Sequence, residues 1–430
     1  MKDNPSPSPE NSQPSGKIFY GWWILILGSL INGIGGGIIY HSFTVFFLPV
    51  KRDLAVSSAA ISLLYGAARL EGGIDGPIYG YLIDRFGPRR IILLGTGLAG
   101  IGFILLSTVE SFLGCCLIYL FTISGGMNAC FYHPVSTVIN RWFIRKRGIA
   151  FSVITASGSF GGMIMAPFLS YIILNHGWRN GALIAGLFIL AIAVPAGIPI
   201  KRSPEAMGLH PDGQPPEGDG MPKNISTFHP PMDVHFGVRE ALRTFSFWIL
   251  MTSISLRILV TMALNTHFVP LMVWRGMSEE GSAYLVSLAA LSSIPMALAL
   301  GWLGDRWDKA KLSCLCLLPT IVAMMGLIFF QGNTVLYLFP IAFSITYATA
   351  PLNWALIGDF FGRRSYATLR GIMGIGYGTA TFISPLYAGW IFDRTNSYSI
   401  ALWTFSAVLV ICAVLFALLR RPIPSRLPNK

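Results

Sequence analysis

GYLIDRFGPRR, residues 80–90, and its weaker copy GWLGDRWDKAK, residues 301–311, decide how this chain folds. Each copy follows a long apolar segment and leads into another, and each carries a glycine, an Asp-Arg pair and a cluster of basic residues. A carboxylate at the end of a membrane span is costly unless a neighbouring helix N-terminus or an arginine holds it. The copies lie 221 positions apart, which indicates an internal repeat.

The composition is that of an integral membrane protein. Of 430 residues, 53% are hydrophobic and 12% are charged, and this charged share is about half that of a typical soluble protein. We therefore predict an all-α protein with twelve transmembrane helices in two pseudo-symmetric six-helix bundles. Apolar runs long enough to cross a bilayer fall near residues 20–48, 59–83, 90–108, 112–137, 148–173, 179–200, 244–270, 281–303, 312–331, 334–360, 365–392 and 398–420.

The net charge of +12 is explained by membrane topology. If the 84–90 turn is cytoplasmic and the spans alternate, cytoplasmic segments carry 24 of the 31 Lys and Arg, external loops 5 and the spans 2. Basic residues concentrate on the cytoplasmic side of membrane proteins. This distribution favours a multi-pass protein of the plasma membrane with both termini in the cytoplasm, and it argues against a nucleic-acid partner.

The chain divides near its middle. Residues 201–243 hold seven Pro and five Gly without a long apolar run, a composition that fits a flexible cytoplasmic linker. The predicted organisation is a disordered cytoplasmic tail (1–17), an N-terminal bundle (18–200), the linker (201–243), a C-terminal bundle (244–421) and a cytoplasmic tail (422–430).

Nothing in the sequence points to catalysis or to a cofactor. There is no nucleophile–base pair, no metal-like cluster and no soluble catalytic domain, so we expect neither an enzyme nor a metal site. The linker and short tails also leave little room for the output module of a sensor. The cysteines all lie in spans without metal-like spacing and are interpreted as buried apolar residues: Cys115, Cys116, Cys130, Cys314, Cys316 and Cys412.

The second span carries three charges, Arg69, Glu71 and Asp75. Arg69 is 16 residues from Arg85, or roughly 24 Å along a helix, which places it close to mid-membrane. Glu71 and Asp75 share a helix face, and Arg69 points away from it. Charges at this depth are usually paired or functional. Two alternatives remain: ion pairs that lock the two halves together, or contacts to substrate or proton.

The seventh span carries Arg257, 12 residues past Phe245 and therefore roughly 18 Å into the membrane. Ser253 and Thr261 lie one turn away on the same face, a polar stripe that must face a cavity or another helix. A guanidinium suits a carboxylate, so Arg257 is a candidate anion ligand, or else a structural partner of the span-two acids. His267, further out, is either a proton-titrating group or a hydrogen-bonding one.

The pattern G-x-L-x-D-R-x-G-x-R-R between spans two and three resembles the signature loop of the major facilitator superfamily, whose degenerate second copy falls between spans eight and nine. Further segments resemble its monocarboxylate transporter and oxalate–formate antiporter branch: RWF-x-x-+-RG at 141–148, SPEAMGLHPDG at 203–213, H-x-VP at 267–270 and DFFGRR…GIMGIGYG…P…GWIFD across 359–393.

This resemblance implies transport of a small organic anion by alternating access, as a proton symporter or an anion antiporter, by a monomer without cofactors. The branch's span-seven histidine matches His267. Its anion-binding arginine usually lies in span eight, where this chain has none, so Arg257 and Arg69 are the only intramembrane cations left to replace it. The alternative is an exporter of drugs or other metabolites that uses Glu71 and Asp75 rather than Arg257.

Three sets of site residues follow as hypotheses. The substrate ligands are Arg257 and Arg69 with hydrogen-bonding groups from spans one, four and ten: Tyr40, Asn128, Tyr132, Tyr347 and Asn353. The proton-coupling candidates are His267, Glu71 and Asp75. The conformational latch at the cytoplasmic ends comprises Asp84, Arg85, Arg89, Arg90, Asp305 and Arg306.

Overall fold

The computed structural model describes residues 19–213 and 236–422, apart from 42, 57–59, 61–63, 65–66, 69–70, 73–74 and 331. The predicted tail at 1–17, most of the tail at 422–430 and residue Arg69 lie outside the described residues. Within them every regular element is a helix. Ten helical runs are long and apolar enough to cross a membrane. The predicted span eleven corresponds to the 30-residue helix at Tyr366–Thr395, and part of the predicted span two lies outside the described residues. The predicted fold class is confirmed.

The N-terminal half contains the first six spans. Span four is one continuous run of α-helical and π-helical turns, and spans one and six also contain a π-helical segment. The elements are α1 (Tyr20–Gly35), η1 (Gly36–His41), α2 (Phe43–Asp53), α4 (Gly76–Phe86), α5 (Pro88–Leu106), α6 (Phe112–Ile118), η2 (Tyr119–Ser124), α7 (Gly125–Met127), η3 (Asn128–Tyr132), α8 (His133–Trp142), α9 (Arg147–His176), α10 (Trp178–Phe188), η4 (Ile189–Ala193) and α11 (Val194–Gly197).

The C-terminal half contains the other six spans, and no π-helical segment is assigned in its described residues. The elements are α12 (Val238–Leu242), α13 (Phe245–Thr266), α14 (Phe268–Trp274), α15 (Glu279–Gly304), α16 (Lys309–Phe329), α17 (Asn333–Tyr347), α18 (Ala350–Phe361), α19 (Tyr366–Thr395) and α20 (Ser399–Leu418).

Glycines set the close helix packing inside the N-terminal half. Gly33 and Gly37 form a G-x-x-x-G step, a spacing that lets another helix approach closely, and α9 packs against it. A Cβ on Gly161 of α9 would overlap the carbonyl group of Gly33, and a Cβ on Gly37 would lie 2.6 Å from the Gly161 oxygen. The helices α1 and α9 therefore cross at backbone contact.

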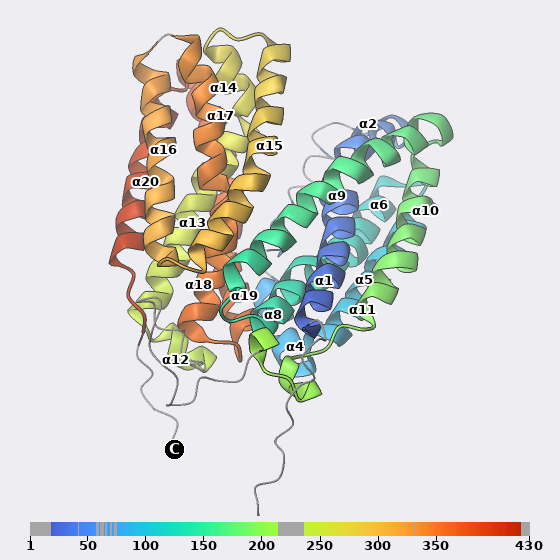
Figure 1. Cartoon of the computed structure of the whole chain (residues 1–430). Coiled ribbons are helices and arrows are strands. Elements are labelled where there is room, and N and C mark those ends of the chain that lie inside the picture. Colours follow the sequence, from blue (N-terminus) through green and yellow to red (C-terminus); the bar gives the residue numbers. More distant parts are fainter. Residues whose placement is uncertain are drawn as a thin grey trace, which may run out of the picture.

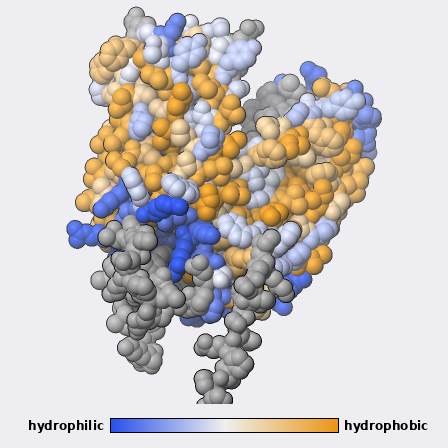
Figure 2. All heavy atoms as spheres, in the orientation of Figure 1, coloured by the Kyte–Doolittle hydropathy of each residue, from blue (hydrophilic) through white to orange (hydrophobic). Residues whose placement is uncertain are grey.

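The two halves meet at one end and diverge at the other (Figure 1). We call the end that carries the turns at 84–90 and 305–309 the loop end, and the opposite one the far end. Helices α4, α8, α18 and α19 converge at the loop end, whereas α9 and α15 separate toward the far end. The surface has a notch between the two halves at the far end (Figure 2). Hydrophobic residues cover the sides of both halves, and hydrophilic residues gather at the loop end.

The linker between the halves is ordered where it is described. It forms two short 3₁₀ turns, η5 (Pro204–Met207) and η6 (Pro211–Gly213). Asp212 accepts hydrogen bonds from the backbone amides of Ile144 and Arg145 at 2.9 and 2.8 Å, and Glu205 forms an ion pair with Arg363 at 2.6 Å. These contacts hold the described start of the linker against the loop end, whereas residues 214–235 of the predicted linker lie outside the described residues.

Candidate functional site

The aspartate of the first repeat lies at the N-terminus of a helix in the opposite half. The Asp84 carboxylate accepts hydrogen bonds from the Thr368 amide at 2.9 Å and the Thr368 hydroxyl at 2.8 Å. Thr368 is the third residue of α19, where backbone N–H groups have no partner within the helix. The N-terminal half thus supplies an acceptor to the C-terminal half.

The aspartate of the second repeat makes the reciprocal contact. Asp305 accepts from the amides of Gly148 at 2.6 Å and Ile149 at 3.0 Å, the second and third residues of α9. Asp84 and Asp305 therefore cap one helix each across the interface. A helix N-terminus is one of the two partners expected from the sequence to hold such a carboxylate.

Burial at the loop end disfavours the charged form of both acids. Burial raises the pKa of Asp84, although the Thr368 bonds and Arg141 oppose the shift. Burial raises the pKa of Asp305 to about 6, against the opposing charge of Lys309. The closed loop end therefore stabilises these carboxylates less well than water does, and this lowers the cost of opening it.

A third acid completes the loop end, and it was not among the predicted site residues. Asp359, at the end of α18, forms ion pairs with Arg147 at 2.6 Å and Lys309 at 2.8 Å. Arg147 belongs to the N-terminal half, and Lys309 also lies 3.9 Å from Asp305. Arg141 pairs with Asp84 at 3.2 Å. These basic residues are nearly buried, so the ion pairs are shielded from water.

The four arginines of the predicted latch are placed differently from its aspartates. Arg85 donates to the Tyr81 hydroxyl of its own helix at 2.8 Å. Arg306 lies 3.8 Å above the Trp302 ring, also within its own turn. Arg89 and Arg90 are exposed. The basic partners of the two aspartates come instead from the 141–147 turn and the start of α16.

A further buried cation, not among the predicted site residues, lies near the start of α19. Arg370, the fifth residue of α19, falls within the predicted span 365–392 and is 0% exposed, so it joins Arg257 as a buried cation of the C-terminal half. Arg370 was counted with the cytoplasmic segments because it follows the basic turn at 363–364. Its guanidinium donates to the Ser136 hydroxyl of α8 and lies 4.4 Å from the centre of the Trp354 ring. The available signal was the Arg-Gly pair at 370–371, which repeats the pair at 147–148.

Arg257 lies on a buried stripe of α13, as predicted for the polar face of span seven. Arg257 is 3% exposed, and Ser253 and Thr261 are 0% and 1% exposed. Each hydroxyl donates to a backbone oxygen one turn earlier in the helix. The thiol of Cys412 in α20 lies 3.2 Å from the backbone carbonyl oxygen of Ser253. This part of the stripe therefore faces α20 of the same half.

The described acids of span two face span four of their own half. The backbone amide of Asp75 donates to the backbone carbonyl oxygen of Glu71 at 2.9 Å, which places the two acids one helical turn apart. A Cβ on Gly125 of α7 would lie 3.8 Å from the Glu71 carboxylate and 3.3 Å from the Tyr79 hydroxyl. Glu71, Asp75 and Tyr79 therefore follow one face of the helix at successive turns.

His267 occupies the break between α13 and α14, with both ring nitrogens hydrogen-bonded. Its Nδ1 lies 3.0 Å from the Tyr398 hydroxyl and its Nε2 lies 3.0 Å from the Pro385 oxygen. A neutral ring satisfies both contacts, since Nε2–H can donate to the carbonyl and Nδ1 can accept from the hydroxyl. His267 thus ties α13 to α19 and to the start of α20.

We expect His267→Ala to lower the free energy of unfolding by about 1–3 kcal/mol, because it removes two hydrogen bonds and leaves their partners unsatisfied. Tyr398→Phe, which removes only one of them, is expected to cost about half as much. Thermal unfolding of the detergent-purified variants measures both effects. Unchanged stability in His267→Ala, together with loss of proton-dependent transport, would contradict this structural role.

The remaining predicted ligands are spread over both halves. Asn353 is 0% exposed, and its side-chain oxygen lies 3.5 Å from the Ser313 hydroxyl of α16. Tyr347, at the end of α17, is 37% exposed. The side chains of Tyr40, Asn128 and Tyr132 lie outside the described part of the chain, but their backbones fall in the π-helical segments η1 and η3. Such segments are frequent at functional sites.

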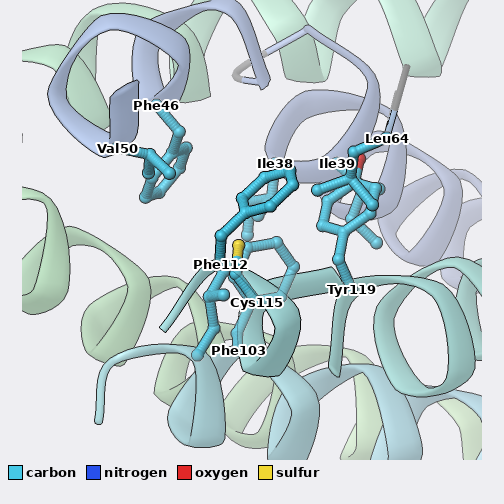
Figure 3. Close-up of a pocket in the computed structure, with 10 residues that line it drawn as sticks. Ile38, Ile39, Phe46, Val50, Leu64, Phe103, Phe112, Cys115 and Tyr119 are labelled. Carbon is cyan, nitrogen blue, oxygen red and sulfur yellow. The ribbon is translucent and has the colours of Figure 1, made fainter. Parts of the chain in front are cut away.

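A small pocket in the N-terminal half does not suit an anion (Figure 3). Its volume is about 40 Å³, little more than a water molecule needs, and its lining offers no exposed polar surface. Its walls come from span one and the neighbouring spans of the same half: Ile38, Ile39, Phe46, Val50, Leu64, Phe103, Leu106, Phe112, Cys115 and Tyr119.

Comparison with known proteins agrees with this architecture. The Major Facilitator Superfamily model matches residues 25–368 and, in a second match, 275–430. Monocarboxylate transporter 12 of Xenopus laevis is 23% identical over 93% of this chain and 88% of its own length. The oxalate:formate antiporter of Oxalobacter formigenes is 26% identical over 93% of this chain and 94% of its own length.

Two solved structures share the fold. The fucose:proton symporter FucP of E. coli has a TM-score of 0.70 at 13% identity, over 93% of this chain and 98% of that one. The human organic anion transporter MFSD10 has a TM-score of 0.64 at 15% identity, over 92% and 97% of the two chains. The matched family consists of transporters rather than enzymes. This chain therefore belongs to the Major Facilitator Superfamily, and over nearly its whole length it is similar to monocarboxylate transporters and to an oxalate:formate antiporter.

Proposed function

We propose that the protein moves a small organic anion of the monocarboxylate type across the plasma membrane by proton symport or anion exchange. The names of its relatives point to carboxylate substrates. The single observation that carries the proposal is that the C-terminal half holds buried guanidinium groups, Arg257 and Arg370, inside its spans. A guanidinium offers a carboxylate a planar, charged, bidentate partner.

Alternating access supplies the transport step in this proposal. The loop end is cytoplasmic, and the closed loop end corresponds to a state that receives substrate from outside. Rocking the two halves about a central site then breaks the contacts of Asp84, Asp305 and Asp359 and opens the loop end. Arg257 is the proposed anion ligand, and its 3% exposure means that neighbouring side chains must move before a carboxylate reaches it.

The test is uptake into proteoliposomes of labelled lactate, pyruvate, formate, oxalate, a larger aromatic acid and one organic cation, each with and without an inward proton gradient. Arg257→Gln is expected to reduce uptake of the transported acid by about tenfold to a hundredfold, the effect of losing one charge-assisted pair. Arg275 follows the last residue of α14, is half-buried and donates to the Phe330 carbonyl; Arg275→Gln is the matched control and should retain uptake.

Two results would contradict the proposal. Transport of the cation but of no acid would favour the exporter that uses Glu71 and Asp75. An acid that moves equally well without Arg257 would make that arginine structural, in keeping with the packing of its stripe against α20.

A further inference from the structure

The closed interface contains a polar cluster between the mid-membrane region and the loop end. His133 and Ser136 come from α8 of the N-terminal half, and Arg370 and Trp354 come from α19 and α18 of the C-terminal half. Arg370 donates to the Ser136 hydroxyl and stacks on Trp354 at 4.4 Å. Ser136 and Arg370 lie within a few turns of the loop end, because α8 ends at Trp142 and α19 begins at Tyr366.

The cluster has features of an anion site that is closed in this state. Arg370 is 0% exposed and His133 is 5% exposed. The Nδ1 atom of His133 is buried and has no hydrogen-bond partner within the described part of the chain. A buried polar atom without a hydrogen-bond partner destabilises the folded state. A ligand that hydrogen-bonds to this nitrogen would remove that destabilisation. Trp354 holds the guanidinium plane by stacking and leaves its edge for hydrogen bonds.

We propose that Arg370 and His133 form a second carboxylate-binding site, which the substrate occupies as it passes to or from the loop end; the inference rests on the proposed transport of an organic anion. In the closed state the guanidinium of Arg370 donates a hydrogen bond to the Ser136 hydroxyl. When the halves separate at this end, Ser136 moves off the guanidinium with α8, and Arg370 presents its fork to the opening cavity while Trp354 still orients it. The Nδ1 atom of His133 then faces the same cavity from α8, opposite Arg370.

Two acidic residues, Asp75 and Asp84, lie near the cluster, where α4 packs against α19. Asp75 directly precedes Gly76, whose added Cβ would lie 3.0 Å from the oxygen of Gly371, the residue after Arg370. Asp84 contacts Thr368, two residues before Arg370. The substrate carboxylate therefore reaches Arg370 in a region that already contains acids, and this favours a weak site from which the substrate leaves readily.

A purely structural role for Arg370 and a substrate-binding role predict opposite changes in the KM for substrate measured from the loop end. If Arg370 only holds the loop end closed, its loss favours the state open at that end, so the KM measured from the loop end falls and the KM from the far end rises. If Arg370 binds the substrate, the KM from the loop end rises. Ser136→Ala separates the two effects, because it removes the closing hydrogen bond and retains the guanidinium.

The experiment measures uptake of labelled lactate and labelled oxalate in right-side-out and inside-out membrane vesicles, which expose the far end and the loop end respectively. Wild type, Ser136→Ala, Arg370→Gln and Arg370→Lys are compared at equal amounts of folded protein, judged by size-exclusion chromatography. We expect the KM measured from the loop end to be about tenfold higher in Arg370→Gln than in Ser136→Ala. The KM measured from the far end should be similar in these two variants. Arg370→Lys is expected to be intermediate, and it also provides a folded variant should Arg370→Gln fail to fold.

A loop-end KM that falls equally in Ser136→Ala and Arg370→Gln would overturn the proposed site and make Arg370 a closing contact only. If wild type transports an acid and only this result appears, the proposed function stands without the second site. If wild type moves neither acid in either vesicle, the proposed function fails for these substrates, and the second carboxylate site fails with it.

Discussion

Replacing Asp359 with asparagine is expected to lower the free energy of unfolding by about 3–5 kcal/mol, the cost of removing one partner from a buried ion pair. The carboxylate lies between Arg147 and Lys309 at 2.6 and 2.8 Å, and these side chains are only 2% and 8% exposed. Asparagine is nearly the same size, so the packing is retained while Arg147 loses its carboxylate partner and Lys309 keeps only the longer contact to Asp305 at 3.9 Å. Thermal unfolding of the purified variant measures the loss.

The matched control is Glu205→Gln, which breaks the ion pair with Arg363. Glu205 is 49% exposed, and a pair of this kind contributes about 0–1 kcal/mol. Adding Lys309→Met to Asp359→Asn removes one of the two cations that lose the Asp359 carboxylate and is expected to recover part of the lost stability. If Asp359→Asn and Glu205→Gln unfold at the same temperature, Asp359 does not hold the loop end together.

The sequence predicted the architecture because membrane spans leave a strong local signal. Apolar length, the basic turns and the two copies of G-x-x-x-D at 80–84 and 301–305 are all visible without a structure. The copies also directed attention to Asp84 and Asp305, and a helix N-terminus was named as one partner that would hold such an acid. Which helix each aspartate caps was not predictable, because the capping amides belong to α19 and α9 of the opposite half.

The candidate site was harder to predict, because side-chain direction depends on which helices touch. Arg85 and Arg306 follow their aspartates directly in the sequence, yet they contact Tyr81 and Trp302 of their own turns. Arg370 follows a basic turn and was counted with it, although the helix begins four residues earlier, at Tyr366. Its partners, Ser136 and Trp354, lie 234 and 16 positions away in the chain.

The cross-interface contacts explain how the loop end can be both closed and ready to open. Asp84 and Asp305 cap helices across the interface, but burial disfavours their charged forms, as the raised pKa of each indicates. Asp359, by contrast, forms ion pairs with two cations, Arg147 and Lys309. Closure thus depends on one strong cluster and on the close fit of the backbones, and this fit leads to the second prediction.

Gly371→Val is expected to reduce transport by about tenfold or more by keeping the loop end from closing. A Cβ at this position of α19 would lie 2.6 Å from the carbonyl carbon of Gly76 and 2.9 Å from the nitrogen of Pro77. Both atoms belong to the backbone of α4, so no side chain can move aside and the two helices must separate. Helix α19 itself should persist, since valine is a better helix former than glycine.

Hydrogen exchange measures the separation directly, because the Thr368 amide donates to Asp84 only while α4 and α19 touch. Peptides that cover residues 366–372 should exchange faster in Gly371→Val than in the wild type. Gly97→Val in α5 is the matched control, since a Cβ there meets nothing within 4 Å, and it should leave both exchange and transport unchanged. Wild-type exchange and transport in Gly371→Val would mean that α4 and α19 need not touch for the transport cycle, and closure would then depend on the Asp359 cluster.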